Sequence, residues 1–521
     1  MASGYQHDLT DANLSGPYRA MEYDADGQPV LRVSVEQTKS SPSGSSAFGE
    51  NLSVTVTPVI QLDALYGLDP REFQAFSQFG GFSEATGTLF KVHTGTNAYG
   101  YGVLRSNRIL RYRPGQGALA RFTAAFENPQ AGVTLRAGLF SQEQALNIGY
   151  DDVTGQFGIL RQNGGKAEIW KLTVTAATGA GNVTITLNGV AHTVALTTDD
   201  ANGTAAQIAA ATFAGWTVEQ CDNTVRFLSQ SVGPMAGVFT MTGTVSTGVF
   251  TQNQVGVAHT NNWTYQTDWN IDTMDGNGPS GIEMDWTKLN IFQVNFRWLG
   301  AGEIRWAMEN PDTGDIVFIH REFYSNRNTD VHLNNPSFRI GYVAANLSSN
   351  AVTDAHVSGA SILAAIEGDI VDNSYTTATT SGTLTSLSQN ILHNLISIKN
   401  SVVYKDKINL REVKPKTLSI SSQNNSPIEL YFILNGNLNI NEEWLKIGDY
   451  SSVIKHTSAG GTFTLSNEQP VVVLIGGING TSTFDLSSYN ISLPPGSTFS
   501  VAAISNQQIQ EINAGLTWSE R

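Results

Sequence analysis

The chain has 521 residues, of which 40% are hydrophobic and only 14% are charged, and its formal net charge is −15 at pH 7. This length suffices for about three domains, and the acidic balance disfavours a nucleic-acid partner, which is held mainly through phosphate contacts. The low share of charge leaves a neutral surface of Ser, Thr, Asn, Gln and Gly, which favours packing against copies of the same chain because little charge must be desolvated.

The chain shows no sign of disulfides, secretion or membrane insertion. Its one cysteine, Cys221, cannot form an internal disulfide, and its β-rich neighbourhood predicts a buried, inert thiol. The first residues, MASGYQHDLTDANL, contain neither the basic segment nor the apolar segment of a secretory signal. The longest apolar run, at 470–478, is too short to cross a bilayer. We therefore expect synthesis in a cytosol and no membrane span.

The first residues differ in character from those that follow. Residues 1–50 hold turn formers and Ser/Gly clusters with too little apolar mass for a core, which predicts an extended N-terminal arm that orders against another surface. From residue 51 on, segments that alternate polar and apolar residues recur roughly every 8 to 12 residues, with Gly, Pro or Asn between them. This spacing predicts an antiparallel β-sandwich over 51–168 that resumes over 256–345.

Between these two halves, residues 169–255 predict a complete β-β-β-α-β module. Asn188-Gly189 joins two of its strands and is the strongest short hairpin signal. Thr204, with Gln207 three residues later, predicts a capping box at the start of an Ala-rich helix. We interpret the module as an insertion in a surface loop of the sandwich, which costs little when the loop ends already lie close together.

The remaining sequence predicts a connector and a second sandwich. Residues 346–388 are small and polar, and a short helix is expected within them over 360–367. Strand patterns restart at 389 and predict a C-terminal β-sandwich over 389–521. The expected fold class is therefore mainly β, with two antiparallel, jelly-roll-like β-sandwiches and a small α+β module inserted in a loop of the first.

One stretch, 398–416, concentrates cations in this acidic chain. These cations alternate with apolar residues and are Lys399, Lys405, Lys407, Arg411, Lys414 and Lys416. The alternation predicts a solvated strand edge guarded by lysine. Contact with an anionic glycan or a lipopolysaccharide is the alternative.

The sequence contains no recognisable catalytic, metal-binding or nucleotide-binding motif. It has no GxSxG elbow, P-loop, Rossmann glycine series or HExxH, and its nine histidines are scattered without i, i+4 spacing. His320 and His332 form the one histidine pair expected in neighbouring strands. We expect neither a metal ion nor another cofactor.

Carboxylates cluster in the segment TDWNIDTMDGNGPSGIEMDW, residues 267–286. Glu283 and Asp285 are two residues apart, so in a strand they would face the same side, a spacing compatible with the acid and nucleophile of a glycosidase. The same oxygens are suited to calcium, although the EF-hand spacing is missing. The third interpretation is a Gly/Asn/Asp-rich connection that only turns the chain.

Two tryptophans stand in polar surroundings near this segment. Trp263 and Trp269 are flanked by Asn, Thr, Gln and Asp. An indole in such a setting is suited to stacking on a sugar ring or on a neighbouring subunit. Both residues are therefore candidates for a glycan or subunit contact.

Several stretches resemble virion proteins of tailed bacteriophages. The inserted stretch VTAATGAGNVTITLNGVAHTVALTTDDANGTAAQIAAATFAG resembles a small module of phage tail and other virion proteins, in which a Thr/Val hairpin with NG precedes an Ala-rich helix. The stretches PVIQLDALYGLDPREFQ, YDDVTGQFGILRQNGG and EIRWAMENPDTGDIVFIHR resemble uncharacterised structural proteins of phage virions, and the terminal portion is similar to their capping sandwiches. The resemblance implies a fibre, capsid decoration or tail-associated protein and carries no catalytic residue.

These observations predict a non-enzymatic structural component of a bacteriophage particle, located in the virion after synthesis in the host cytoplasm. Its expected partners are copies of itself, as a homo-oligomer with a trimer favoured, other virion proteins and a host-surface glycan. The alternative is a phage-borne glycan-binding protein or polysaccharide depolymerase, with Glu283 and Asp285 as its catalytic pair.

Overall fold

The chain divides into two compact units, Met1–Thr55 and Val56–Arg521. In the first unit, β1 (Met21–Tyr23) and β2 (Pro29–Leu31) form an antiparallel pair, and the rest of the predicted N-terminal arm lies outside the described residues. The residues that this computed structural model describes, over which all strands are counted, are 21–23, 29–31, 55–370, 375–439, 443–457, 459–464 and 472–521.

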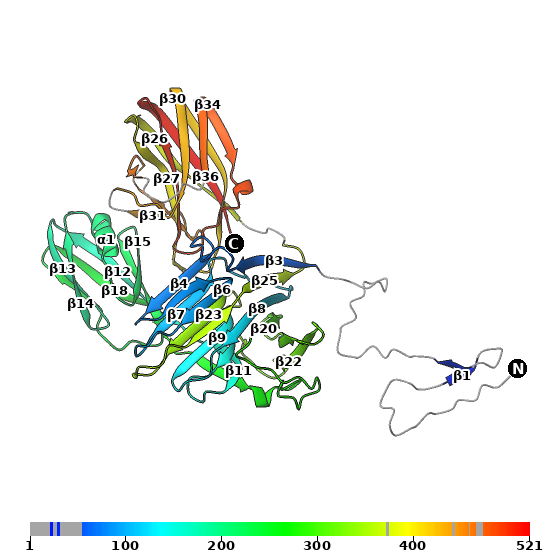
Figure 1. Cartoon of the computed structure of the whole chain (residues 1–521). Coiled ribbons are helices and arrows are strands. Elements are labelled where there is room, and N and C mark those ends of the chain that lie inside the picture. Colours follow the sequence, from blue (N-terminus) through cyan, green and yellow to red (C-terminus); the bar gives the residue numbers. More distant parts are fainter. Residues whose placement is uncertain are drawn as a thin grey trace. The chain divides into compact units, whose positions relative to one another are not determined.

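The second unit begins with two large antiparallel sheets that form a sandwich. The strands of the seven-stranded sheet, in spatial order, are β19 (Thr260–Tyr265), β11 (Phe157–Asn163), β10 (Ala145–Tyr150), β9 (Val133–Phe140), β23 (Arg339–Asn346), β7 (Tyr101–Ser106) and β4 (Phe73–Gln78) (Figure 1). The strands of the nine-stranded sheet are β22 (Ile316–Glu322), β21 (Ile304–Glu309), β20 (Asn290–Phe296), β8 (Ala118–Phe126), β24 (His356–Gly359), β6 (Leu89–His93) and β5 (Phe82–Thr86), with β25 (Ser361–Glu367) and β3 (Val56–Asp63) beside them.

Alternation along these strands builds the core between the two sheets. In β20, Phe292, Val294 and Phe296 are each 1% exposed, as their period-2 spacing in the sequence predicts. Trp306 on β21 is equally buried in the same cluster. The other face of each strand is left to point outward, which for the seven-stranded sheet is the face that carries the candidate site.

Part of the region predicted to be a connector, residues 356–367, belongs to this sandwich, whereas residues 375–387 belong to a strand of the C-terminal sheet. Residues 360–367, predicted as a short helix, form β25 instead, which pairs with β3 and β8. β24 pairs with β6 and β8. The helix prediction was wrong because Ile362, Ala364 and Ile366 repeat every second residue and are all buried, which is the pattern of a strand.

The inserted module lies between two paired strands of the first sandwich. β11 and β19 are antiparallel neighbours with Asn163 opposite Thr260, and the module runs between them. Its strands and helix are β12 (Ala167–Ala177), β13 (Gly181–Leu187), β14 (Val190–Leu196), α1 (Ala201–Ala210), β15 (Trp216–Cys221), β16 (Thr224–Val232), β17 (Thr240–Gly243) and β18 (Ser246–Gln254). The loop ends are therefore adjacent, which is the condition under which an insertion disturbs its host least.

Local signals in the module were read correctly for the turn and incorrectly for the helix cap. Asn188 and Gly189 both have positive φ, 50° and 83°, as a two-residue hairpin turn requires. The N-cap of α1 is Asp200, whose carboxylate accepts a hydrogen bond from the Gly203 N–H, and Thr204 lies within the helix. Asp200 was the better candidate because it directly precedes the Ala-rich run.

The C-terminal part is a sandwich-like arrangement of antiparallel strands around its own core, so the mainly β fold class is confirmed. In the long strand β30 (Val413–Leu434), residues 413–422 pair with β36 and residues 429–434 pair with β35. The other strands are β26 (Tyr375–Leu387), β27 (Leu392–Asn400), β28 (Val403–Tyr404), β29 (Lys407–Ile408), β31 (Trp444–Lys446), β32 (Val453–His456), β33 (Thr462–Phe463), β34 (Val472–Asp485), β35 (Thr498–Ile504) and β36 (Ile509–Glu520).

The structure bears on the predicted lack of a membrane span and on the predicted burial of Cys221. Over the described residues, no helix has both the length and the apolar character needed for a bilayer span. Cys221 is 3% exposed, and burial raises the pKa of its thiol to about 12. The prediction of a buried thiol is confirmed.

Candidate ligand-binding groove

The outer face of the seven-stranded sheet carries a continuous row of side chains from seven strands. Backbone pairing places one residue of each strand in register across the whole sheet. In spatial order this row is Gln74, Arg105, Gly341, Gly138, Asn147, Leu160 and Trp263. Their immediate neighbours along the strands, such as Leu104, Ile340 and Leu146, point the other way and are buried in the core.

This outer face forms one wall of a cavity of about 820 Å³. The sheet contributes all of the row except the two glycines, together with residues two or four positions along the strands, among them Phe76, Tyr101, Arg136, Gln162 and Arg339. Residues of the inserted module and of the C-terminal part complete the lining, including Thr217, Gln230, Val402 and Leu410. We call this cavity the sheet groove.

Two glycines occupy the centre of the outer face of the seven-stranded sheet. Gly341 and Gly138 are paired neighbours on β23 and β9, so no side chain rises from the centre of the face. A Cβ at Gly341 would lie 2.0 Å from the Leu104 carbonyl oxygen, and a Cβ at Gly138, where φ is 136°, would lie 2.5 Å from that of Leu146. Any larger residue at these positions would push the strands apart.

Three arginines lie around these glycines, and none of them forms an ion pair with a carboxylate of the described residues. Arg105 Nε donates to the Gln74 Oε1 atom at 3.1 Å, and its guanidinium lies 4.7 Å from the centre of the Phe76 ring. Arg339 donates to the backbone carbonyl oxygens of Ser106 and Asn107. Arg136 has a buried Nε with no hydrogen-bond partner.

Burial weakens the basicity of these guanidinium groups. It lowers the pKa of Arg105 to about 10 and that of Arg339 to about 9, and the nearby charge of Arg105 lowers the pKa of Arg339 further. The pKa of Arg136 is lowered by burial as well, against the opposing effects of Tyr101 and Asp152. Arg105 and Arg339 remain cationic at neutral pH, because their pKa values lie above it, so the sheet groove carries concentrated positive charge with little water to screen it.

Aromatic rings flank the arginines. At one end of the sheet groove the side chains of Phe76, Phe79 and Tyr99 are 45%, 64% and 53% exposed. At the other end Trp263 and Tyr265 lie on β19 with nearly parallel rings, 6.5 Å apart and inclined by 10°. Exposed ring faces beside polar side chains are typical of surfaces that bind another molecule.

The two candidate tryptophans occupy different environments. Trp263 is half-buried and lines the sheet groove. Trp269 is 5% exposed, packs in the core against Trp286, and donates its indole N–H to the Thr264 carbonyl. The expectation of a surface contact at Trp269 is therefore corrected, because its polar sequence neighbours belong to a loop that turns the ring inward.

Glu283 and Asp285 lie in the loop between η1 (Gln266–Asp268) and β20, and both are exposed. Glu283 forms an isolated bridge with Asp275, and Asp285 accepts hydrogen bonds from the backbone N–H and the hydroxyl of Thr287. These bonds lower the pKa of Asp285. Neither residue lines the sheet groove, and the catalytic role stays an untested alternative.

The acidic loop uses its carboxylates to hold its own backbone. Asp272 is 2% exposed and accepts hydrogen bonds from the backbone N–H groups of Met274 and Ser280. Asp275 accepts from the hydroxyl of Thr273 and the N–H of Asn277. The described residues contain no group of three or more His, Cys, Asp and Glu side chains arranged to hold a metal ion.

The two histidines considered as a pair are held separately. His320 Nδ1 accepts a hydrogen bond from the Asn270 N–H, whereas His332 Nδ1 donates to the Gly300 carbonyl oxygen at 2.9 Å. Burial lowers the pKa of both imidazoles, so both are neutral at pH 7. Each imidazole ring therefore forms a hydrogen bond with a nearby backbone group.

The basic stretch 398–416 is not a strand edge. Lys399 belongs to β27, which has β35 on one side and β32 on the other, and Lys414 belongs to β30, where it is opposite Ser519 of β36. Lys405 lies between β28 and β29, 4.8 Å from the centre of the Tyr450 ring. The edge prediction was wrong because charges spread over three elements were assigned to one strand.

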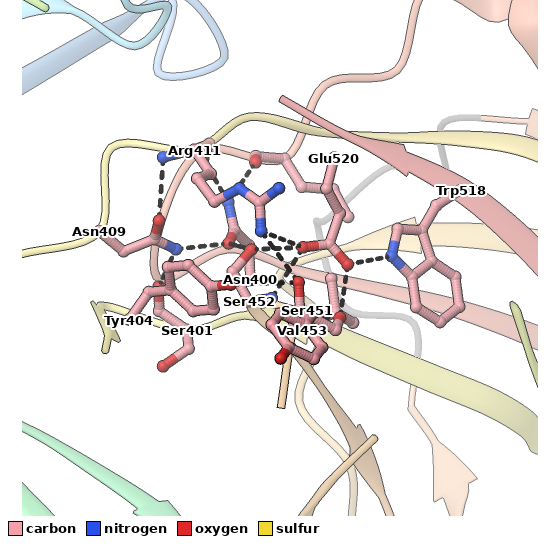
Figure 2. Close-up of polar contacts among 12 residues, drawn as sticks. Asn400, Ser401, Tyr404, Asn409, Arg411, Ser451, Ser452, Val453, Trp518 and Glu520 are labelled. Carbon is pink, nitrogen blue, oxygen red and sulfur yellow. Dashed lines mark hydrogen bonds and ion pairs between the residues drawn. The ribbon is translucent and has the colours of Figure 1, made fainter. Parts of the chain in front are cut away.

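Arg411 of that stretch belongs to a buried network in the C-terminal sandwich (Figure 2). The Glu520 carboxylate accepts hydrogen bonds from Arg411 at 3.1 Å, from the Trp518 indole at 2.9 Å and from the Ser452 backbone N–H at 2.7 Å, and it also accepts from the Ser451 hydroxyl. Because the chain itself satisfies this buried carboxylate, the network stabilises the sandwich and leaves no polar group for a ligand.

The arginines and glycines of the sheet groove were missed in the sequence. Arg105, Arg136 and Arg339 are far apart along the chain, and only the strand order β9-β23-β7 brings them together. The signal that was present is glycine at outward positions of otherwise apolar strands, at Gly138 and Gly341. Such glycines indicate a bulge or a close backbone approach.

Comparisons with known proteins give only distant likeness. No family profile matches the chain, and no curated protein matches its sequence. The chain is similar to the metal-free carbohydrate recognition domain of Emp46p, with 10% identity, a TM-score of 0.23 and coverage of 61% of this chain and 100% of that one. It is also similar to the Bauhinia forficata lectin in complex with GalNAc (10% identity, TM-score 0.21, coverage 60% and 98%) and to a structure of infectious bursal disease virus, Gx strain (9%, 0.16, coverage 78% and 74%).

Proposed function

We propose that this chain is a non-enzymatic structural component of a bacteriophage particle that binds a carbohydrate of the host surface in its sheet groove. The observation that carries the binding role is the row of outward side chains from Gln74 to Trp263, which lines a cavity on one face of the sheet. The particle role is supported by the sequence resemblance to virion proteins of tailed phages and by the charge-poor composition.

The lining fits a carbohydrate better than an apolar molecule. The amide side chains of Asn147, Gln162 and Asn261 line the sheet groove, and each amide both donates and accepts hydrogen bonds, as a sugar hydroxyl requires in return. The Trp263 ring at one end and the exposed rings at the other offer flat apolar surfaces for the faces of sugar rings. A few convergent polar groups among aromatic rings are typical of ligand sites.

The chemistry of the lining supports binding without hydrolysis. Glycoside hydrolysis commonly uses two carboxyl groups on either side of the scissile bond. Among the described residues that line the sheet groove, Asp152 supplies the one carboxyl group. The depolymerase alternative places the chemistry at Glu283 and Asp285, and it predicts that Glu283→Gln and Asp285→Asn abolish cleavage of host polysaccharide.

Binding is tested with the full-length chain against a panel of bacterial surface polysaccharides, measured by biolayer interferometry. Trp263→Ala is expected to weaken binding at least tenfold. Tyr66→Ala is the matched control, since this side chain is 98% exposed and lies outside the sheet groove. Binding that survives Trp263→Ala, or that is lost equally in Tyr66→Ala, contradicts the assignment.

The particle role has its own test. We expect mass spectrometry of purified phage particles to detect this polypeptide at a copy number that matches the symmetry of one particle element. We also expect the isolated chain to form a homo-oligomer, with a trimer favoured, in light scattering. A monomer absent from purified particles contradicts the particle role and leaves the binding role to its own experiment.

A further inference from the structure

The charge in the sheet groove is opposite to the charge of the whole chain. The formal net charge is −15, yet the sheet groove is lined by three arginines and one carboxylate. Its one histidine, His259, is neutral at pH 7 because burial lowers the pKa of the imidazole. A local concentration of positive charge in an acidic protein attracts an anionic ligand.

The register of the strands places the three arginines around one point. Arg105 is directly opposite Gly341, and Arg339 is two residues from Gly341 along β23, so their Cα atoms are separated by about 8 Å. Arg136 lies on the other side of the Gly341–Gly138 pair, two residues from Gly138 along β9. The Gly341–Gly138 pair therefore lies between the three arginines on this face of the sheet.

Two arginines elsewhere in the described residues are paired with carboxylates. Arg161 Nε lies 2.6 Å from Glu322, and Arg411 lies 3.1 Å from Glu520. By contrast, Arg105 and Arg339 donate to neutral oxygens, and Arg136 leaves a buried Nε without any partner. A guanidinium taken out of water is stable only when its lost hydration is replaced, and buried polar groups without a partner are rare enough to call for an explanation.

We propose that the sheet groove binds an acidic glycan, whose carboxylate or phosphate group sits above Gly341 and Gly138 and accepts hydrogen bonds from Arg105, Arg136 and Arg339. The proposal rests on the proposed function and specifies its ligand. Guanidinium groups bind carboxylate and phosphate oxygens in a bidentate manner, which matches either acidic group. Neither glycine places a side chain between the three arginines.

A glycan fits these observations better than a nucleic acid. The acidic charge of the chain would repel a long phosphate backbone outside the sheet groove, whereas a glycan brings one acidic group for each repeating unit and hydroxyl groups for Asn147 and Gln162. Binding of oligo-dT as tightly as of the acidic glycan would overturn the proposal.

The experiment compares matched ligands on the full-length chain by isothermal titration calorimetry. The probes are oligogalacturonate, its carboxyl-reduced neutral counterpart and oligo(glycerol phosphate). The first two isolate the carboxylate, and the third asks whether phosphate serves as the acidic group. We expect at least one acidic probe to bind at least tenfold more tightly than the neutral one, with an affinity that falls as salt is raised.

Arg136→Gln is the decisive variant because no group of the described residues forms a hydrogen bond with the Arg136 Nε atom. It is expected to remove the preference for the acidic probe, whereas Arg108→Gln, which changes an exposed arginine outside the sheet groove, is expected to retain it. Equal binding of acidic and neutral probes, both lost in Trp263→Ala, overturns the acidic ligand and leaves carbohydrate binding intact. Absence of binding to every probe overturns both.

Discussion

Arg105 and Arg339 project from neighbouring strands onto the same face of a sheet, and neither guanidinium contacts a carboxylate. Arg105 donates a hydrogen bond to the Gln74 amide oxygen, and Arg339 donates one to the backbone carbonyl oxygen of Ser106. Burial lowers the pKa of both guanidinium groups. Two cations held close together out of water destabilise the free protein. An anionic ligand would explain this arrangement, because functional sites commonly reduce the stability of the free protein.

Removal of the third cation of the sheet groove, Arg136, should therefore not destabilise the fold. We expect Arg136→Gln to change the free energy of unfolding by no more than about 0.5 kcal/mol, or to raise it. The control is Arg161→Gln, which leaves Glu322 buried without its partner and should cost about 2 kcal/mol. Both are measured by urea unfolding. A loss above about 1 kcal/mol for Arg136→Gln would mean that this arginine is structural.

The pH dependence of stability should contain a contribution from Glu303. Burial alone would raise the pKa of this carboxyl group, but hydrogen bonds from Arg321, Arg305 and Arg297 outweigh it and hold the pKa below 4.5. The stabilisation is thus present above pH 4.5 and is lost as the pH falls through the lower pKa of the folded state.

We therefore expect Glu303→Gln to be less stable than the wild type at pH 7, with a difference that shrinks as the pH falls below about 4.5. Thermal unfolding from pH 7 to pH 3 measures it. A difference that stays constant over this range would show that Glu303 contributes through packing and not through its charge.

Cys221 should be unreactive in the folded protein. A thiol with a pKa of about 12 is ionised in only about one molecule in ten thousand at pH 8, and its side chain is also buried. Reaction with Ellman's reagent should be undetectable in native buffer and should give one equivalent in guanidinium chloride. Rapid reaction of the native protein would place the thiol at the surface. Cys221→Ser gives the background.

The inserted module should be removable. Since Asn163 and Thr260 face each other on β11 and β19, replacement of residues 164–259 by Asn-Gly would join the two strands by a two-residue hairpin turn. We expect the shortened chain to keep a β-type circular dichroism spectrum and a cooperative thermal transition. An aggregated or unfolded product would show that the module is needed for the first sandwich to fold.

The alternation of residues along strands and the residues typical of turns predicted much of the fold. The alternation of Phe292, Val294 and Phe296 gave the correct buried face, and Asn188-Gly189 gave the correct turn, because both are determined by residues within a few positions of each other. The prediction failed over 360–367, where small residues at strand spacing were interpreted as a helix.

The candidate site was only partly visible in the sequence. Trp263 was singled out for its polar surroundings and does line the sheet groove, whereas Trp269, chosen by the same criterion, is buried. The arginines could not be connected, since Arg136 and Arg339 come onto the same face of the sheet only through the pairing of β9 with β23, where they lie four residues out of register. Strand order depends on the packing of the whole sandwich, and the local sequence pattern of a single strand does not predict it.

The most direct test of the account is the structure of the full-length protein with bound oligogalacturonate or oligo(glycerol phosphate). We expect density for an acidic group above Gly341 and Gly138, within hydrogen-bond distance of Arg105, Arg136 and Arg339, and a sugar ring or chain that extends towards Trp263. A ligand bound instead at the loop of Glu283 and Asp285, with the sheet groove empty, would contradict it.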